Sequence, residues 1–552
     1  MSHDQPAGQP AGQPAPTEYL GDAPRPRRGG RRWGLVGGAA VAVVGAAAAA
    51  AWGVSQFLGA GPEPATAAPA NTLAYVGLDL DPSGGQKIEA LKTLRKFPGL
   101  EDKLGIGSSD DLKRSLLEKL VKESSCDGLD YADDIEPWLG DKVGFGAVPG
   151  GDGPVPFAVV QVSDETKARR GVAALGVCGS DGGPGAKVGI AFVGDYMVLA
   201  ETDTIAAGIV ADVDKGSLAD DPTYQKWVDE AGGDGILTAY VSPDGLRAAV
   251  DAMGPLGDPF ATSGHLSSTD VLTADPSATP GASSVDDVES RTQKALADFQ
   301  GGAVVARFDN EAFKVELAAG GLPAKVGTGG DSGITDLPSS TAMALALGVS
   351  DTFAQDFVDG LRRSMGSDQV DGILSEVETS TGLTLPQDLQ TLLGNGVSVA
   401  VDDSIDVGAF GGAGGSAPSD LPLGVRITGD PSKIMPVVQK VLDVTGAGAQ
   451  GVVVEQGSGA VAIGVSRDYL KRLAADGDLG GQPRFAEALP DLRAGSGALY
   501  VDFDAGDWLM RTLDNAPDSA DLRANLQPLS ALGVTGDMDG STMHAVVRLT
   551  TD

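Results

Sequence analysis

The chain has 552 residues, enough for two or more domains, and an ordinary hydrophobic content of 42%. Its formal net charge is −36, but the first 34 residues carry five arginines and three acidic residues (5 − 3 = +2), so the remainder carries −38. Such an acidic surface repels phosphate backbones and excludes nucleic acid as a partner.

Within residues 1–32, the first 24 are low in complexity, with Ala-Gly-Gln-Pro repeated at 7–10 and 11–14. A segment of this composition cannot bury a core. We therefore expect a disordered cytoplasmic tail.

Residues 33–58 contain no charged side chain and are built mainly from Ala, Val, Gly and Leu. A bilayer core needs roughly 20 apolar residues, so this segment predicts one transmembrane helix. The basic residues precede it, which places the N-terminus in the cytoplasm and the C-terminal domain outside, at the cell membrane. The membrane-orienting residues are Arg25, Arg27, Arg28, Arg31 and Arg32.

Two alternatives to an uncleaved anchor stay open. One is a cleaved signal peptide, because small residues follow at 65–68, and the other is a twin-arginine signal around Arg31-Arg32. All three interpretations export the same domain.

After a Pro-containing linker at 59–70, the chain runs through a series of elements and then repeats it. The first copy, residues 71–321, opens with an alternating strand at 72–79 and continues with strands at 142–148 and 156–164. It carries a Ser-, Thr-, Pro- and Gly-rich insertion at 255–290, which we expect to be mobile.

A second linker at 322–338 leads to the second copy, residues 339–552, whose matching strands are 341–348, 397–401 and 422–430. The spacing between copies drifts only from 269 residues (341 − 72) to 260 (500 − 240, aligning Tyr240 with Tyr500). The pattern predicts an α+β fold of two homologous halves, with mainly antiparallel sheets and packed helices, preceded by the transmembrane helix. Whether the halves share one sheet stays open.

No catalytic, cofactor-binding or metal-binding residue is predicted. The three histidines, His3, His265 and His544, are scattered, and no H-E-x-x-H or C-x-x-C is present. The acidic group at 502–507 lacks the Glu that a calcium loop needs at its twelfth position. Paired carboxylates of a hydrolase meet only in space and stay open.

Cys126 and Cys178 are the only cysteines. Outside the cytoplasm they predict a disulfide, worth roughly 4 kcal/mol in the loop-entropy model. Two separate free thiols are the alternative.

An Arg-flanked apolar segment followed by a long duplicated domain that opens with Leu73-Ala-Tyr-Val-Gly-Leu-Asp79 resembles an actinobacterial single-pass membrane protein family with an extracytoplasmic domain of unknown function. The resemblance covers nearly everything after residue 33. It implies a membrane location and no catalytic residues.

The leading hypothesis is a non-enzymatic envelope protein that binds a ligand or partner between its halves, because pockets favour such interfaces. The partner is an envelope protein, a lipid or a small ligand. The alternatives are a carboxylate-dependent extracytoplasmic hydrolase and an apolar lipid carrier. Raised carboxyl pKa values favour the enzyme, a dry apolar tunnel the carrier, and an exposed apolar patch protein binding.

Overall fold

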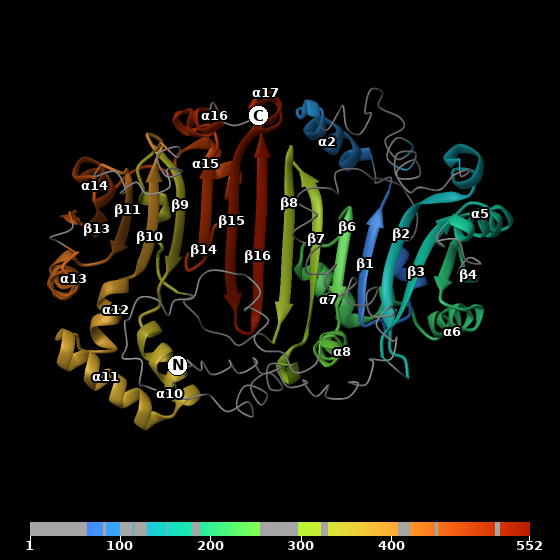
Figure 1. Ribbon diagram of the computed structural model, residues 1–552, viewed down its shortest axis with the longest axis horizontal. Coiled ribbons are helices and arrows are strands. Elements are labelled where there is room, and N and C mark those ends of the chain that lie inside the picture. The colour runs from blue at the N-terminus through green and yellow to red at the C-terminus, as the bar shows by residue number, and fades with distance from the viewer. Residues whose placement is uncertain are drawn as a thin grey trace, which may run out of the picture.

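The structure is a computed structural model that describes residues 63–80, 84–99, 114, 117, 130–151, 153–178, 188–253, 296–321, 329–406, 420–447, 451–513 and 519–552. In this described part of the chain, sixteen strands form one continuous antiparallel sheet, and helices pack against it (Figure 1). The strand order is β12-β13-β11-β10-β9-β14-β15-β16-β8-β7-β6-β1-β2-β3-β5-β4. The α+β class with antiparallel strands is thus observed.

The strands are β1 (Ala74–Asp79), β2 (Leu139–Val148), β3 (Val155–Val162), β4 (Gly189–Val193), β5 (Tyr196–Ala200), β6 (Leu237–Val241), β7 (Gly301–Asp309), β8 (Ala312–Gly320), β9 (Thr341–Gly348), β10 (Gly396–Asp402), β11 (Leu423–Thr428), β12 (Val453–Gln456), β13 (Ala460–Gly464), β14 (Gly497–Asp502), β15 (Leu529–Asp539) and β16 (Thr542–Thr551).

The α-helices are α2 (Gly84–Leu94), α5 (Glu165–Cys178), α6 (Asp203–Val213), α7 (Pro222–Glu230), α8 (Pro243–Met253), α10 (Phe353–Met365), α11 (Ser367–Thr381), α12 (Gln387–Leu393), α13 (Pro431–Thr445), α14 (Arg467–Ala474), α15 (Pro483–Ala488), α16 (Trp508–Leu513) and α17 (Ser519–Leu526). The short turns of helix are η1 (Pro64–Ala67), η2 (Tyr131–Ile135), η3 (Leu218–Asp220), η4 (Ile334–Asp336) and η7 (Ala505–Asp507).

The two halves of the chain share this sheet. From the centre outwards, the first half runs β8-β7-β6-β1-β2-β3-β5-β4 and the second β16-β15-β14-β9-β10-β11-β13-β12, which is the same order. They meet where β8 pairs with β16, in a register from Phe313↔Leu549 to Gly320↔Thr542. Each half ends in an antiparallel hairpin, β7–β8 or β15–β16.

The predicted fold class is nevertheless wrong as a whole. The sequence left open whether the halves share one sheet, and they do; an equal strand order does not show common descent, so the predicted homology between the halves is not shown. The predicted transmembrane helix at 33–58 lies outside the described residues. Among the residues that are described, no helix is both long and apolar enough to cross a membrane.

One side of the sheet, here called the covered face, packs against α6, α7, α14 and α15. Asp221 caps α7 by accepting hydrogen bonds from the amides of Thr223 and Tyr224. This helix places the Trp227 ring on β7 and β8, fully buried, with its Nε1 donating to the Gln300 carbonyl at 2.8 Å. The indole therefore fills the core without leaving a polar atom unpaired.

The equivalent place in the second half is taken by α15. Its Phe485 ring lies 5.0 Å from the Tyr500 ring on β14, in an edge-on arrangement. Tyr240 on β6 similarly meets Tyr224 of α7 at 5.2 Å. The aligned tyrosines Tyr240 and Tyr500 are thus both buried on the covered face, and each packs against an aromatic ring of the helix above it.

One local expectation differs between the halves. The pattern predicts that the Leu-Gly pairs at 139–140 and 393–394 each end a helix. In the second half, α12 ends at Leu393 and Gly394 has a φ of 55°, a helix-ending conformation that suits glycine. In the first half, Leu139 and Gly140 instead begin β2, after the short helical turn η2.

Candidate functional site

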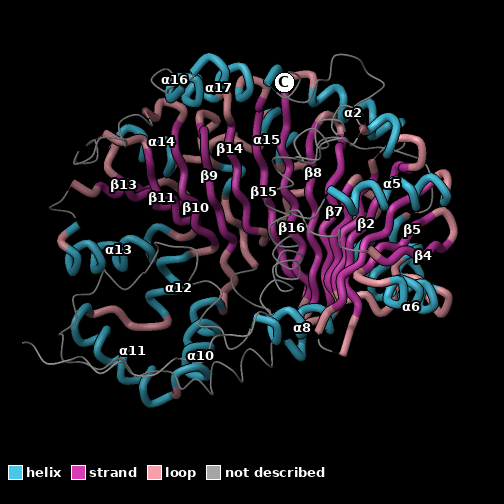
Figure 2. Tube along the Cα trace, turned by 45° about the vertical axis from the view of Figure 1, so that its right-hand side comes forward, coloured by secondary structure: helices cyan, strands magenta, loops and turns pink. Residues whose placement is uncertain are grey.

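The side of the sheet opposite α6, α7, α14 and α15, here called the open face, is only partly covered by helices. α5 packs on it at one outer end, α12 and α13 at the other, and α2 and α16 on strand ends along its border. Between them, the central strands have no described helix in front of them (Figure 2). The large apolar side chains exposed there are Phe145 (57%), Leu347 (53%), Leu345 (49%), Val399 (37%) and Val547 (36%).

The alternation along β9 shows that this exposure is systematic. Ala344 and Ala346 point to the covered face and are at most 1% exposed. Leu345 and Leu347 point to the open face and are about half exposed. The small side chains let the helices of the covered face approach the sheet closely. Because side chains alternate along a strand, the larger residues of β9 then face solvent.

Neighbouring strands continue the same surface. Leu345 lies directly opposite Val399 of β10 on one side and Leu499 of β14 on the other. Val547 of β16 lies opposite Val315 and Val534. The backbone amides and carbonyls beneath are used by the strand ladder, so this surface offers aliphatic contact with few polar groups.

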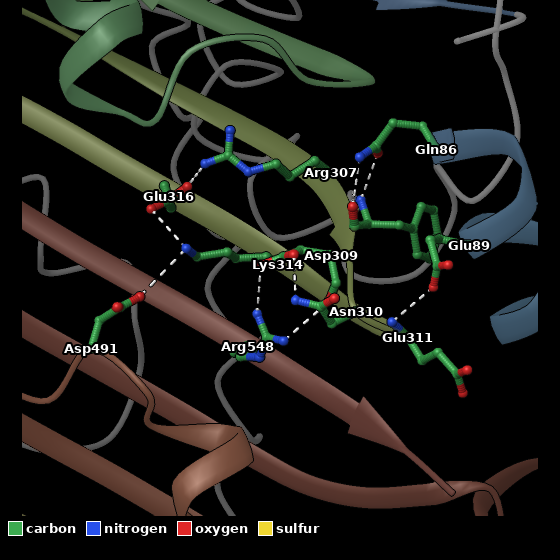
Figure 3. A network of polar contacts seen from close by, with 11 residues as sticks. Gln86, Glu89, Arg307, Asp309, Asn310, Glu311, Lys314, Glu316, Asp491 and Arg548 are labelled. Atoms are coloured by element: carbon green, nitrogen blue, oxygen red, sulfur yellow. Dashed lines mark hydrogen bonds and ion pairs between the residues drawn. The ribbon is translucent and has the colours of Figure 1, made fainter. Parts of the chain in front are cut away.

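The covered face carries a different feature at the centre of the molecule, a set of charged residues over β7, β8 and β16 (Figure 3). We call it the charged joint: Arg307, Asp309, Lys314, Glu316, Asp491 and Arg548. Glu316 pairs with Arg307 and, at 3.1 Å, with Lys314, whose ammonium is also 3.5 Å from Asp491. Burial lowers the pKa of the Arg307 guanidinium below its ordinary value.

The charged joint connects the two halves of the chain. Arg548 of β16 donates to the Asp309 carboxylate and to the Asp309 carbonyl, each at 3.0 Å. Gln86 of α2 exchanges hydrogen bonds with the backbone of Phe308, at 2.6 and 2.9 Å, and the Glu311 amide donates to Glu89 (Figure 3). Each charged side chain of the joint has an oppositely charged neighbour, although Nε of Arg548 is buried without a hydrogen-bond partner among the described residues. The joint therefore supports the β8–β16 pairing and leaves the open face as the better binding surface.

A pair of carboxylates bears on the hydrolase alternative. Burial, and then the neighbouring carboxyl of Asp552, raise the pKa of Asp504 to about 6. Arg484 lies 3.1 Å from Asp504 and 3.8 Å from Asp552, so one guanidinium partly neutralises both. No group of three or more His, Cys, Asp or Glu in the described residues is arranged to hold a metal ion. A single salt-bridged pair is a weaker candidate than the open face.

The residues singled out from the sequence lie mostly elsewhere. The five orienting arginines, from Arg25 to Arg32, are outside the described residues, and so is Cys126. Cys178 is the last residue of α5, but its side chain is not described, so the disulfide stays a prediction. His544 lies on β16 with Nε2 3.6 Å from a Glu230 carboxylate oxygen, while His3 and His265 are outside the described residues.

The open face is not predicted from the sequence, because alternation along a strand does not say which set of side chains faces the helices. The signal that could have found it is the pairing of Ala, Gly and Ser with Leu and Val in Thr341–Gly348 and Gly396–Asp402. A strand in which small apolar side chains alternate with large ones has two apolar faces. When helices cover one face of such a sheet, the other apolar face is exposed and can bind a partner.

Comparison with known proteins gives one match. No curated protein and no solved structure matches the chain. Residues 35–412 match the family described as "Protein of unknown function (DUF3352)", which spans β1 to β10 and ends in the connection after β10. The resemblance to a family with a domain of unknown function is thereby confirmed, whereas an actinobacterial origin and a single-pass membrane architecture are not shown. The match covers more than half of the chain, which therefore belongs to the DUF3352 family.

Proposed function

We propose that the protein is a non-enzymatic binding protein and that it holds a partner protein against the open face of its sheet. The observation that carries the proposal is the exposure of Leu345, Leu347 and Val399, adjacent aliphatic side chains on β9 and β10. Contiguous apolar surface of this kind marks interaction sites in folded proteins.

The energetics of burial support a partner with an apolar surface. Fully burying a Leu or Val side chain is worth about 1.5–3 kcal/mol, and roughly half of that remains to be gained at Leu345 and Leu347. Three such residues together offer a gross gain of about 3 kcal/mol, before the costs of association. Since the surface has few polar groups, a partner recognised here contributes apolar side chains rather than hydrogen bonds.

The net charge of −36 decides between partners. An acidic protein is repelled by the anionic surface of a membrane, which disfavours lipid headgroups as the ligand. A protein surface with an apolar centre and a basic rim meets both the aliphatic and the acidic character of the molecule. Its place outside the cytoplasm, predicted from the arginine cluster and the apolar segment after it, belongs to the same proposal.

Photocrosslinking from a single position tests the proposal. p-Benzoylphenylalanine is placed at position 347 of the full chain in the cells that make it, and at position 88 as the control, because Ile88 of α2 is equally exposed (56%) but lies away from the β9–β10 surface. We expect one protein adduct of defined mass at 347, absent at 88 and lost when Leu345→Asp is added. Adducts at both positions alike, adducts with lipid alone, or no adduct at 347 would overturn it.

A further inference from the structure

The helix pair α10–α11 is a second exposed apolar surface, built from residues that the open face does not use. The pair is inserted between β9 and α12, and both views place it beyond the ends of the strands (Figures 1 and 2). α10 packs on α11 and α12, and α11 packs on α13. Phe357 (48%), Met365 (38%) and Ile373 (44%) are exposed on it.

One side of α10 carries a regular stripe, in which Phe357 is exposed and Phe353 and Gly360 are partly buried. Phe353, Phe357 and Gly360 are spaced four and three residues apart, so they lie on one side of the helix. The rings of Phe353 and Phe357 are stacked with their centroids 6.3 Å apart. Gly360 extends the stripe with bare backbone, since a Cβ built there meets only the tip of Arg363, at 3.9 Å.

The glycines of the pair have no packing explanation in the described structure. A glycine inside a helix costs roughly 0.5–1 kcal/mol relative to alanine. Gly360 lies inside α10 and Gly372 inside α11, and a Cβ built at Gly372 meets nothing within 4 Å. At Gly360, one turn from Phe357, the missing side chain leaves backbone that another helix can approach closely.

The pair is also acidic. Residues 353–381 contain six acidic and two basic residues, a balance of 2 − 6 = −4. Arg362 joins the two helices, with Nη1 3.1 Å from Asp359 and Nη2 2.9 Å from Asp371. Those hydrogen bonds raise the pKa of Arg362 further, so this base is engaged within the pair. The remaining acidic residues of the two helices are Asp356, Asp368, Glu376 and Glu378.

We infer that α10–α11 is a docking site for an amphipathic α-helix of another protein, one whose apolar stripe is flanked by Lys and Arg. The stripe of Phe353, Phe357 and Gly360 receives the apolar side, and the acidic residues of α11 face its basic flanks. This is the helix-on-helix form of peptide recognition, in which apolar anchors fix affinity and charge fixes the choice of partner. The site does not depend on the open face.

A pair of synthetic peptides tests both requirements on the full chain. One is a fluorescein-labelled 18-residue helix with Leu on one side and Lys on the other, and the second has Glu in place of every Lys. We expect fluorescence anisotropy to show binding of the Lys peptide at least tenfold tighter than of the Glu peptide. The Phe357→Ser/Ile373→Ser variant should weaken the Lys peptide at least tenfold, while Ile88→Ser, the matched exposed residue on α2, should not.

Hydrogen–deuterium exchange on the unaltered chain gives a second readout, free of any folding defect in a variant. We expect the Lys peptide to slow exchange in residues 353–381 and not in β9 or β10. Equal binding of both peptides, equal binding to the Phe357→Ser/Ile373→Ser variant, or protection confined to the sheet would overturn the inference. Protection of β9 and β10 alone would speak for the open face, so the two proposals fail separately.

Discussion

Leu345 of β9 and Val399 of β10 lie directly opposite each other on adjacent antiparallel strands, and both face away from α14 and α15. Between them and the core lies a layer of alanines, since Ala344 and Ala400 on the same strands are also paired and at most 1% exposed. On this side of the sheet the pair has only strand neighbours, Leu499 of β14 beside Leu345 and Val425 of β11 beside Val399. Between about a third and a half of each side chain is left exposed (37% of Val399 and 49% of Leu345).

At positions 344 and 345, we expect that enlarging the small residue lowers the free energy of unfolding more than truncating the large one does. Leu345→Ala should lower the free energy of unfolding by only about 1 kcal/mol, because about half of the side chain is already in water. Ala344→Leu should lower it by about 1–3 kcal/mol, because the added atoms enter the packed layer that includes Tyr500. Urea titration of both variants measures the difference. A tolerated Ala344→Leu would show that the alanine layer is not closely packed.

The charged joint predicts energetic coupling between the two halves. Arg548 is 9% exposed and Asp309 40%, with a 3.0 Å contact, so a double-mutant cycle of Arg548→Met and Asp309→Asn should give a coupling of about 0.5–1.5 kcal/mol. The exposed pair Lys215–Asp212 is the control, for which we expect less than about 0.5 kcal/mol. Equal coupling in both cycles would mean that the joint is no stronger than an ordinary surface ion pair.

Asp504 predicts a specific pH dependence of stability. Burial and the neighbouring Asp552 raise its pKa to about 6 in the folded state, above the ordinary value of about 3.9, so the folded state binds the extra proton between these values. The contribution of this group to stability is therefore present at pH 4 and is lost as the pH rises through 6. Asp504→Asn should remove that loss and raise the free energy of unfolding at pH 8 by about 1 kcal/mol, discounted for solvent screening.

The control for this pH effect is Asp468→Asn, because the Asp468 side chain is 97% exposed. It should leave the difference in stability between pH 4 and pH 8 unchanged. Urea titrations at the two pH values, carried out on the unaltered chain and both variants, give the comparison. An Asp504→Asn variant whose pH dependence matches that of the unaltered chain would contradict the raised pKa.

The positions of the strands can be predicted from the sequence. The pairing that joins the two halves into one sheet cannot. Period-two alternation locates β1 and β9, and the repeated spacing anticipates the common strand order. The pairing of β8 with β16 joins residues more than 200 positions apart, and nothing local in Phe313–Gly320 specifies which strand will complete its edge. An edge strand has unpaired backbone amides and carbonyls that can pair with any other available strand. The single sheet therefore depends on the fold of both halves and not on the local sequence of β8.

The candidate surfaces were hidden from sequence reasoning for a related reason. A large residue in an alternating strand is usually a core residue. Leu345 faces solvent because the helices of the covered face pack on the alanine side of β9. The charged joint was hidden because its six members come from three strands and a loop, far apart in the chain. In contrast, the apolar spacing of α10 is visible in the sequence, but its exposure depends on how α12 and α13 hold the pair.

Two helix glycines give the last prediction, because one has room for a methyl group and the other has none. Gly360→Ala in α10 should raise the free energy of unfolding by about 0.5–1 kcal/mol, since nothing but the Arg363 tip lies near the new methyl group. Gly245→Ala in α8 should lower it by about 1–3 kcal/mol, because the methyl group would meet the Leu73 backbone carbonyl. Thermal unfolding compares the two. If Gly360→Ala raises stability yet weakens the Lys peptide, the glycine is kept for helix docking at the expense of stability. If the same variant leaves peptide binding unchanged, the bare backbone plays no part in docking and only the aromatic stripe does.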